Sequence, residues 1–198
     1  MHVEVRKITD IELLREIIGF ILDKESTMTL RKAYYNRHSP VRTQMFLVKM
    51  IIPTEVSVHL RTHSQVGQFH YVSSNREDWS GNKPEEVNRQ TPVRHVMLLN
   101  AEHLLQIAEA RLCSKSLEAT RRVVQAITEK VEEVDPELAA RMHPKCFRQG
   151  GVCYEDDPCG IHLLMLRQVV EQIPEKFYRD WRNDFAIKQA NESNPEVN

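Results

Sequence analysis

The sequence contains no apolar run that approaches the ~20 residues of a membrane-spanning helix. Its opening residues, MHVEVRKITD, lack the apolar core of a signal peptide. We therefore expect a cytoplasmic protein without a membrane partner. In that compartment the four cysteines stay reduced.

The sequence also lacks an excess of charge of one sign. Lys and Arg number 27, Asp and Glu number 28, and the formal net charge is −1 with histidine neutral. No field of the whole molecule then attracts nucleic acid, and we expect no nucleic-acid partner. An anionic ligand must instead be bound by arginine and histidine side chains that are gathered at one place.

Three motifs that mark common active sites are missing. The pattern G-x-S-x-G, which places the nucleophile of many hydrolases, does not occur. Neither a P-loop nor a G-x-G-x-x-G pattern occurs, so nucleotide binding by these two devices is excluded.

The chain is long enough for one domain with a sizeable core. We place this domain at residues 1–190 and expect the polar tail 191–198 to fray. Val3 and Val5 alternate with polar neighbours, as in a short strand.

A first helix is predicted after this strand. Thr9 and Glu12 fit the capping box of a helix that runs to about Leu22. Its apolar residues form one stripe, which we expect to face the core: Leu13, Leu14, Ile17, Ile18 and Ile21.

Further helices are predicted in the second half of the chain. Residues 93–112 contain a strong helix with Asn100 as its cap. The next helix turns one set of residues inward: Leu117, Val123, Val124, Ile127 and Val131. Asp135 and Pro136 then begin a short helix, with Asp as N-cap and Pro at the first helical position.

The stretch 53–78, PTEVSVHLRTHSQVGQFHYVSSNRED, concentrates polar side chains more than any other. It follows the apolar run 45–52, which has the length of a buried strand. Thr54 is a candidate cap for a short helix on which Val56 and Leu60 share one face. The helix should fail near Gly67. The segment would present imidazole, hydroxyl and guanidinium groups to a cleft, although a solvated helix with scattered histidines explains it equally well.

Four arginines at separate places in the chain are candidate anion receptors, because a guanidinium suits a phosphate or a planar imide better than an ammonium does. They are Arg61, Arg76, Arg94 and Arg111. Each alone is an ordinary surface salt-bridge residue. Their neighbours are rich in His, Ser and Asn, which favours a binding role.

Three cysteines lie near each other in the sequence. Cys146, Cys153 and Cys159, with His143 upstream, would supply the four ligands of a zinc site. The C-x-x-C pattern typical of such sites is absent. We therefore expect no metal and regard these cysteines as reduced thiols of a packed loop.

Three regions of the chain resemble the flavin-dependent thymidylate synthases, especially their shorter bacterial and phage relatives. The strongest is 98–121, LLNAEHLLQIAEARLCSKSLEATR. The family carries an Asn-Ala pair, an amide six residues after the asparagine and an arginine eleven residues after it. The matching positions here are Asn100, Ala101, Gln106 and Arg111.

The second region, 143–160, is similar to the family's C-terminal signature G-P-x-C…G-x-C-x-E…C-G. In the third region the family carries H-E-[ST]-V-x-E-H, a strand, a proline, Q-W-x-R-H-R and S-x-R. His38, Pro53 and His63 take the places of the first histidine, the proline and the histidine of R-H-R at nearly the family's spacing.

The third region also departs from the family. The R-H-R triplet reads Thr62-His63-Ser64, and an arginine is displaced to Arg61. His59 replaces the glutamine of Q-W, and His70 lies near the place of a missing Asn-Glu pair. The S-x-R pattern survives as Ser74-Asn75-Arg76 if two residues are inserted.

The resemblance implies an α/β (α+β) fold, rich in helices with a small sheet, that assembles as a homotetramer with active sites at subunit junctions. It implies an FAD-dependent methyltransferase that makes dTMP from dUMP without an enzyme nucleophile. Reduced FAD delivers a hydride, 5,10-methylenetetrahydrofolate supplies the carbon, and NADPH reduces the flavin.

The resemblance also implies the site residues. Those for FAD are His38, Ser39, Arg61, Thr62, His63, Ser64, Asn100 and Gln106. Those for dUMP are His59, Arg61, Ser74, Asn75, Arg76, Arg89 and Arg111. Arg111 is also the expected catalytic residue, because the matching arginine faces the uracil imide and stabilises negative charge on the ring. Without the resemblance, Arg111 is a cation at a helix C-terminus and Asn100 is a helix cap.

Two alternatives remain open at this point. The altered R-H-R site is compatible with a synthase of a modified pyrimidine, for instance by hydroxymethyl transfer to dUMP or dCMP. A relative that keeps the fold and binds a nucleotide without catalysis is compatible with the same residues, because fold does not fix function.

Overall fold

The computed structural model describes residues 1–62, 67–74 and 87–160. The chain forms two compact units, residues 1–145 and residues 146–198. The expected extent of one domain over 1–190 stays a prediction, and the tail 191–198 lies outside the described residues. None of the described helices is both long and apolar enough to cross a membrane.

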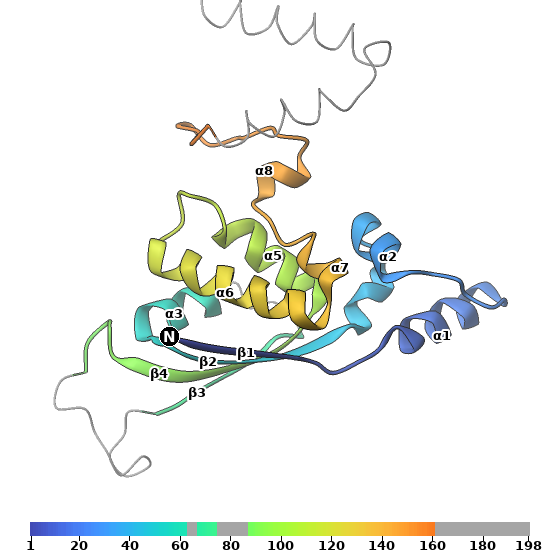
Figure 1. Ribbon diagram of the computed structural model, residues 1–198, viewed down its shortest axis with the longest axis horizontal. Coiled ribbons are helices and arrows are strands. Elements are labelled where there is room, and N and C mark those ends of the chain that lie inside the picture. The colour runs from blue at the N-terminus through green and yellow to red at the C-terminus, as the bar shows by residue number, and fades with distance from the viewer. Residues whose placement is uncertain (63–66, 75–86, 161–198) are drawn as a thin grey trace, which may run out of the picture. The chain divides into compact units, whose positions relative to one another are not determined.

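The first unit is built on a four-stranded antiparallel sheet with the strand order β1-β2-β4-β3. Four helices lie on one side of this sheet (Figure 1). The strands are β1 (His2–Lys7), β2 (Met45–Pro53), β3 (Phe69–Val72) and β4 (Pro92–Asn100). The four helices are α3 (Thr54–Arg61), α5 (Ala101–Arg111), α6 (Glu118–Val134) and α7 (Pro136–Ala139). The predicted fold class, helix-rich with a small sheet, is confirmed.

Three further elements lie between β1 and β2 in the chain. They are α1 (Ile11–Leu22), α2 (Leu30–Asn36) and the 3₁₀ helix η1 (Ser39–Thr43). The helix η1 contacts both α1 and α5, so it connects this N-terminal segment to the helices that lie on the sheet.

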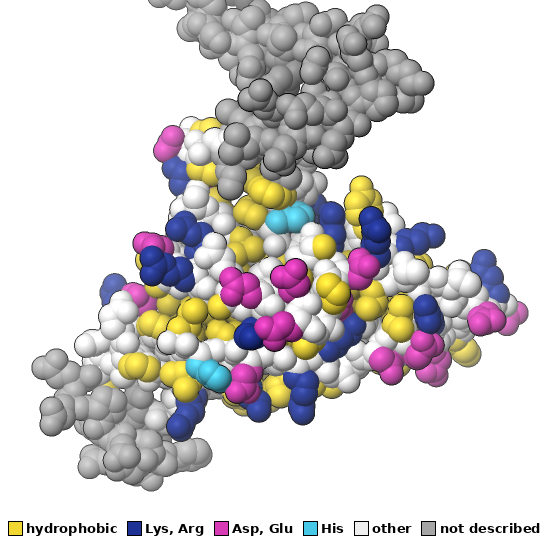
Figure 2. All heavy atoms as spheres, viewed as in Figure 1, with side chains coloured by type: hydrophobic (Ala, Val, Ile, Leu, Met, Phe, Trp, Pro, Cys, Tyr) yellow, Lys and Arg dark blue, Asp and Glu magenta, His cyan; other side chains and the backbone are white. Residues whose placement is uncertain are grey.

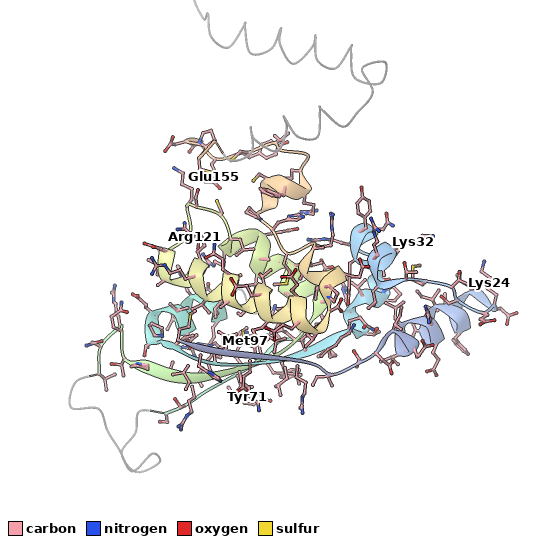
Figure 3. All side chains as sticks on the ribbon, in the orientation of Figure 1. Lys24, Lys32, Tyr71, Met97, Arg121 and Glu155 are labelled. Atoms are coloured by element: carbon pink, nitrogen blue, oxygen red, sulfur yellow. The ribbon has the colours of Figure 1, made fainter. Side chains whose placement is uncertain are left out.

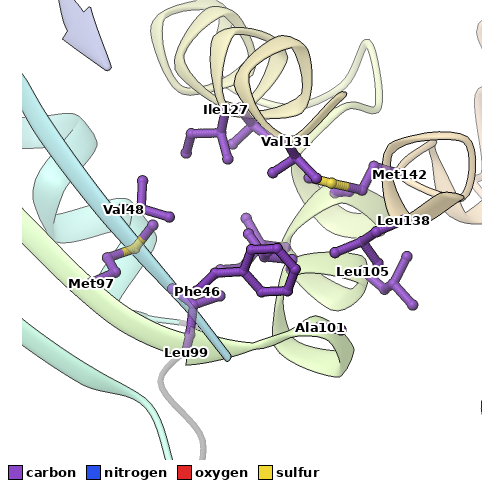
Figure 4. Packing of buried hydrophobic residues seen from close by; sticks show 14 of the residues in the cluster. Phe46, Val48, Met97, Leu99, Ala101, Leu105, Ile127, Val131, Leu138 and Met142 are labelled. Atoms are coloured by element: carbon purple, nitrogen blue, oxygen red, sulfur yellow. The ribbon is translucent and has the colours of Figure 1, made fainter. Parts of the chain in front are cut away.

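The core lies between the sheet and the helical layer. Successive strand residues point to opposite faces of a sheet, so every second residue of β2 and β4 is buried here. Figure 4 shows these side chains against those of α5, α6 and α7. The labelled members of the cluster are Phe46, Val48, Met97, Leu99, Ala101, Leu105, Ile127, Val131, Leu138 and Met142.

Two helix starts differ from the sequence prediction. Helix α1 is capped by Asp10, whose carboxylate accepts from the backbone N–H groups of Glu12 and Leu13. Thr9 is instead bound to the chain before β2, where its hydroxyl donates to the Thr43 carbonyl at 2.7 Å. Thr54 is the first residue of α3 and not its cap, and its hydroxyl donates to the Thr91 carbonyl at 2.9 Å.

The predicted apolar stripes are partly wrong. On α1 only Leu14 and Ile18 are buried, whereas Leu13 and Ile21 are exposed. On α6 the four residues predicted inside the helix are buried, but Leu117 precedes the helix and is exposed. The apolar face of a helix can be wider than the surface that neighbouring elements cover, so some of its apolar residues stay exposed.

Strand β4 was not predicted, because residues 93–112 were assigned only to a helix. The helix begins at Ala101, and the preceding nine residues form the strand that pairs with both β2 and β3. The missed signal is the alternation of Val93, His95, Met97 and Leu99, all of which are buried.

A buried polar anchor joins α7 to the sheet. Asp135 caps α7, as predicted, by accepting from Leu138 N–H at 3.1 Å. The same carboxylate accepts from the Tyr34 hydroxyl at 2.7 Å and from Lys7 Nζ at 2.6 Å. Burial raises the pKa of Tyr34, and the bond to Asp135 raises it further, so this phenol remains a donor.

The described part of the second unit is short. Helix α8 (Lys145–Arg148) leads into a turn in which Gly151 N–H donates to the Cys146 carbonyl at 2.8 Å. Gly150 and Gly151 both have positive φ, which suits glycine. No disulfide joins cysteines of the described residues. The absence of a metal from the cysteine-bearing loop stays a prediction.

Candidate functional site

The C-terminal end of α3 carries the first group of predicted site residues. Val56 and Leu60, which were predicted to share one face of the helix, are fully buried and fix its orientation. Arg61 is its last residue, and Thr62 follows as C-cap; both are exposed. His59 is turned toward α6, where its Nδ1 lies 3.1 Å from the Thr120 hydroxyl.

Arg111 is brought to the same place by α5. Its Nη2 donates to the Thr62 hydroxyl at 3.3 Å, although the two residues are 49 positions apart. Its Nε is buried without a partner in the described chain. Burial lowers the pKa of Arg111, but a guanidinium stays protonated in proteins. We call Arg61, Thr62 and Arg111 the cationic corner.

The cationic corner has no acidic counterpart among the described residues. No described carboxylate forms a salt bridge with Arg61 or Arg111. Figure 2 shows acidic and basic side chains interspersed over the visible face. Because neither arginine forms a salt bridge with a described carboxylate, the two guanidinium groups are available to an anionic or imide ligand.

The nearest acids of α5 are held by Arg37. This residue pairs with Glu102 at 3.3 Å and also contacts the buried Glu109. The sequence did not predict these contacts, because Arg37 lies more than sixty positions before either glutamate. Their consequence is that these carboxylates do not compete for Arg111.

Asn100 caps α5 and Gln106 lies within it, and each side chain retains a different polar group for a ligand. Asn100 Oδ1 accepts from His103 N–H at 3.1 Å and so caps the helix, as predicted. Gln106 Nε2 donates to Glu102 at 3.4 Å, whereas Gln106 Oε1 is buried without a described partner. The remaining capacity for a ligand is therefore the Asn100 amide N–H and the Gln106 carbonyl oxygen.

The other predicted residues lie at several places. His38 and Ser39 begin η1, which contacts α5. Ser74 follows Ser73 after the end of β3, where Ser73 N–H donates to the Arg94 carbonyl and the Ser73 hydroxyl accepts from Arg94 N–H. Arg89 is exposed, and its carbonyl accepts from Glu55 N–H. His63, Ser64, Asn75 and Arg76 lie outside the described residues.

A histidine pair beside Arg61 was not singled out as a site from the sequence. His70 Nδ1 lies 3.0 Å from His95 Nε2, and His70 Nε2 lies 3.4 Å from Gln68 Oε1. Burial first, and then the charges of His70 and Arg61, lower the pKa of His95 to about 4. Burial and Arg61 lower the pKa of His70 as well. We call Gln68, His70 and His95 the histidine relay.

Comparisons with known proteins agree on the fold. Neither protein-family models nor curated proteins give a match to the sequence. Among solved structures, the flavin-dependent thymidylate synthase ThyX from Helicobacter pylori, complexed with FAD and dUMP, superposes with a TM-score of 0.60. The identity is 10%, and the match covers 72% of this chain and 100% of that one.

A further structure of ThyX from Helicobacter pylori with FAD and dUMP gives a TM-score of 0.54 at 10% identity, covering 71% of this chain and 97% of that one. The UMP/dUMP methylase PolB from Streptomyces cacaoi, bound with 5-Br dUMP, gives 0.53 at 11% identity, covering 71% and 94%. The resemblance expected from the sequence is thus confirmed at the level of architecture: the chain has the fold of the flavin-dependent thymidylate synthases.

Proposed function

We propose that the protein transfers a one-carbon unit from 5,10-methylenetetrahydrofolate to C5 of a pyrimidine deoxynucleotide, converting dUMP to dTMP with FAD and NADPH. The observation that carries the proposal is the cationic corner: Arg111 of α5 donates to Thr62, the residue that follows Arg61 at the end of α3, and no described carboxylate forms a salt bridge with either arginine. The fold is shared with proteins whose structures contain FAD and dUMP or a brominated dUMP.

The residues present fit a flavin. Arg61 and Thr62 offer donors for its phosphates, together with His63 and Ser64 of the same segment. Gln106 Oε1, which is buried and without a described partner, suits the imide N–H of a flavin ring. Asn100 retains its amide N–H, and His38 and Ser39 lie on η1 against α5. Bound FAD would supply the hydride.

The pyrimidine nucleotide needs its own contacts. We assign its phosphate to Ser74 and Arg76, with Asn75, Arg89 and His59 as further candidates. Arg111 takes the uracil imide, where its planar donors stabilise negative charge as N3 loses a proton or O2 and O4 gain electron density. A well-aimed donor of this type contributes about 3–4 kcal/mol to the transition state.

Mass analysis of the product tests the reaction. The purified protein is incubated with FAD, NADPH, 5,10-methylenetetrahydrofolate and either dUMP or dCMP, and we expect dTMP from dUMP. A hydroxymethyl product would replace this reaction by the modified-pyrimidine synthase that the broken R-H-R triplet allows. Binding of FAD and dUMP without any new product would identify a non-catalytic relative.

A flavin titration tests the displaced arginine. Arg61→Ala should weaken FAD binding by about tenfold or more, because charge-assisted contacts contribute roughly 1.5–3 kcal/mol. Arg122→Ala is the matched control, since Arg122 forms an exposed pair with Glu118 on α6. Equal FAD affinity in Arg61→Ala and the parent would remove Arg61 from the site.

A further inference from the structure

The histidine relay connects the centre of the sheet to its edge. His95 belongs to β4 and is fully buried, whereas His70 belongs to the edge strand β3. The two rings are tilted by 49° with their centroids 5.2 Å apart, and one hydrogen bond joins them. Gln68 precedes β3 and extends the chain of polar contacts from His70. The order His95, His70, Gln68 therefore runs outward from the core.

The direction of the hydrogen bonds follows from burial. His95 is neutral near pH 7, so only one of its ring nitrogens carries a proton. Its Nδ1 is buried without a partner in the described chain. A proton there would leave a buried donor unsatisfied, so the proton lies on Nε2 and is donated to His70 Nδ1. His70 then carries its own proton on Nε2 and donates it to Gln68 Oε1.

This arrangement fixes which way the Gln68 amide faces. Gln68 Oε1 accepts the hydrogen bond from His70 Nε2, so Gln68 Nε2 points in another direction and is free to donate. The structure leaves Gln68 Nε2 buried without a described partner. An unsatisfied buried donor costs about 1–3 kcal/mol, and native proteins retain few of them without a reason.

A second unpartnered group belongs to a ring that packs against Gly67, the residue before Gln68. His103 Nδ1 is also buried without a described partner. His103 Cε1 lies 3.7 Å from the position that a Cβ on Gly67 would take, so this ring packs against the residue before Gln68. Gln106, whose Oε1 is unpartnered as well, follows His103 by three positions and shares its side of α5. Three polar groups without a described partner thus lie on two segments that approach each other at Gly67 and His103.

We propose that Gln68, oriented by His70 and His95, is a ligand-binding residue whose amide N–H donates to an imide carbonyl oxygen of a planar heterocycle, with His103 beside it. The inference rests on the proposed function, since uracil and the flavin ring both carry such an imide. Where the ring is uracil, it adds a specificity determinant to that function, because a fixed N–H group can donate to a keto oxygen but not to the amino group of cytosine.

Neutral rings of His70 and His95 suit the orientation of Gln68. A charged His70 would add a cation close to Arg61 and would favour an anion over a neutral ring. A neutral relay instead holds the amide by hydrogen bonds alone and leaves the anions to the arginines. His70 and His95 are positioning residues, since they act through Gln68.

The experiment uses Gln68→Met, which keeps the size of the side chain and removes the donor. FAD binding is measured by flavin fluorescence without nucleotide, and dUMP and dCMP binding by calorimetry without FAD. We expect a loss of about tenfold in one arm, which corresponds to one hydrogen bond of about 1.4 kcal/mol. The arm that weakens identifies the ring. Gln90→Met is the matched control, because Gln90 is exposed and bound to Glu55.

A second variant, His70→Phe, tests the relay without touching the ligand. It should reduce the preference for dUMP over dCMP, or lower FAD affinity, because the released amide can turn its oxygen outward. Unchanged affinities in both arms for both variants, beside a parent that binds FAD and dUMP, would overturn the inference and leave the proposed function intact. A parent that binds neither ring would overturn both.

Discussion

Two arginines near α5 have opposite roles. Arg37 is bound by two carboxylates, whereas Arg111 has one hydroxyl contact and a buried Nε without a described partner. The paired residue stabilises the fold, because it supplies a cation to two carboxylates that are largely buried. The unpaired residue has capacity for a ligand.

Arg111→Lys should therefore lower turnover far more than stability. We expect a loss of about 100-fold or more in turnover, because an ammonium cannot reproduce the planar fork, and less than ~1 kcal/mol in unfolding free energy. Melting temperature, nucleotide affinity and flavin oxidation rate are measured on the same variant. Arg37→Lys is the control and should lower the melting temperature. A large loss of melting temperature with near-normal turnover in Arg111→Lys would make Arg111 structural.

His95 should make stability depend on pH in the acid range. Its pKa in the folded protein, about 4, is below the ordinary value of 6.5. The unfolded chain therefore binds the proton first, and stability is lost as the pH falls from 6.5 to 4. The loss from this residue is on the order of 3 kcal/mol. The pKa values of His70 and His103 are lowered as well and act in the same direction.

Urea unfolding at several pH values measures this effect. His95→Phe should show a shallower fall of unfolding free energy between pH 6.5 and pH 4 than the parent. Parallel curves for the parent and His95→Phe would show that His95 titrates in the folded protein as it does in the unfolded chain.

At the scale of the element, the passage from β4 to α5 has two functions at one residue. Asn100 ends the strand, and its side-chain oxygen begins the helix. The amide N–H remains for a ligand. A cap of this kind contributes about 1 kcal/mol, and an aspartate can replace it without loss at a helix N-terminus.

Asn100→Asp should thus retain the melting temperature and lose FAD affinity, while Asn100→Ala should lose both. Calorimetry and flavin titration separate the two effects. Asp10→Ala, which removes the cap of α1, should lower stability by about 1 kcal/mol and leave FAD affinity unchanged. Parent-like FAD binding in Asn100→Asp would reduce Asn100 to a helix cap.

At the scale of the whole molecule, the sheet keeps one face that no described helix covers. In Figure 3, Tyr71 lies on this face and Met97 on the side of the helices. Apolar side chains gather across the strands here: Leu47, Ile51, Phe69, Tyr71, Val96 and Leu98. Phe69 and Tyr71 are 51% and 61% exposed, which is costly unless another surface covers them.

A second copy of the chain suits this face. Glu4 and Lys49 pair across β1 and β2 on it, with Arg6 nearby, so both signs of charge are present. A copy of the same face can satisfy both signs, whereas nucleic acid would need cations alone. A homotetramer is the assembly we propose, and in its subunits this face would be buried.

Tyr71→Glu should then lower the molar mass measured by light scattering in the presence of FAD. Phe20→Glu is the control, because Phe20 is 90% exposed at the end of α1, away from this face. A parent that is strictly monomeric at micromolar concentration would contradict the tetramer. An unchanged mass in Tyr71→Glu would place the interface elsewhere.

The sequence by itself determined the elements whose signals are local. Alternation predicted β1, the apolar run predicted β2, and the Asp135-Pro136 pair predicted the start of α7. Asn100 was predicted as the cap of α5, and the family resemblance predicted the architecture. These features depend on neighbours within a few positions, or on motifs whose spacing survives at low identity.

Only the tertiary structure decided which side chains meet. It placed β4 between β2 and β3, joined His70 to His95, and gave the α5 carboxylates to Arg37 instead of Arg111. It also left Ile21 of α1 exposed while Leu14 is buried. The partners in each case lie far apart in the chain or on another element. Their meeting depends on strand order and helix packing, which a local pattern of residue types does not contain.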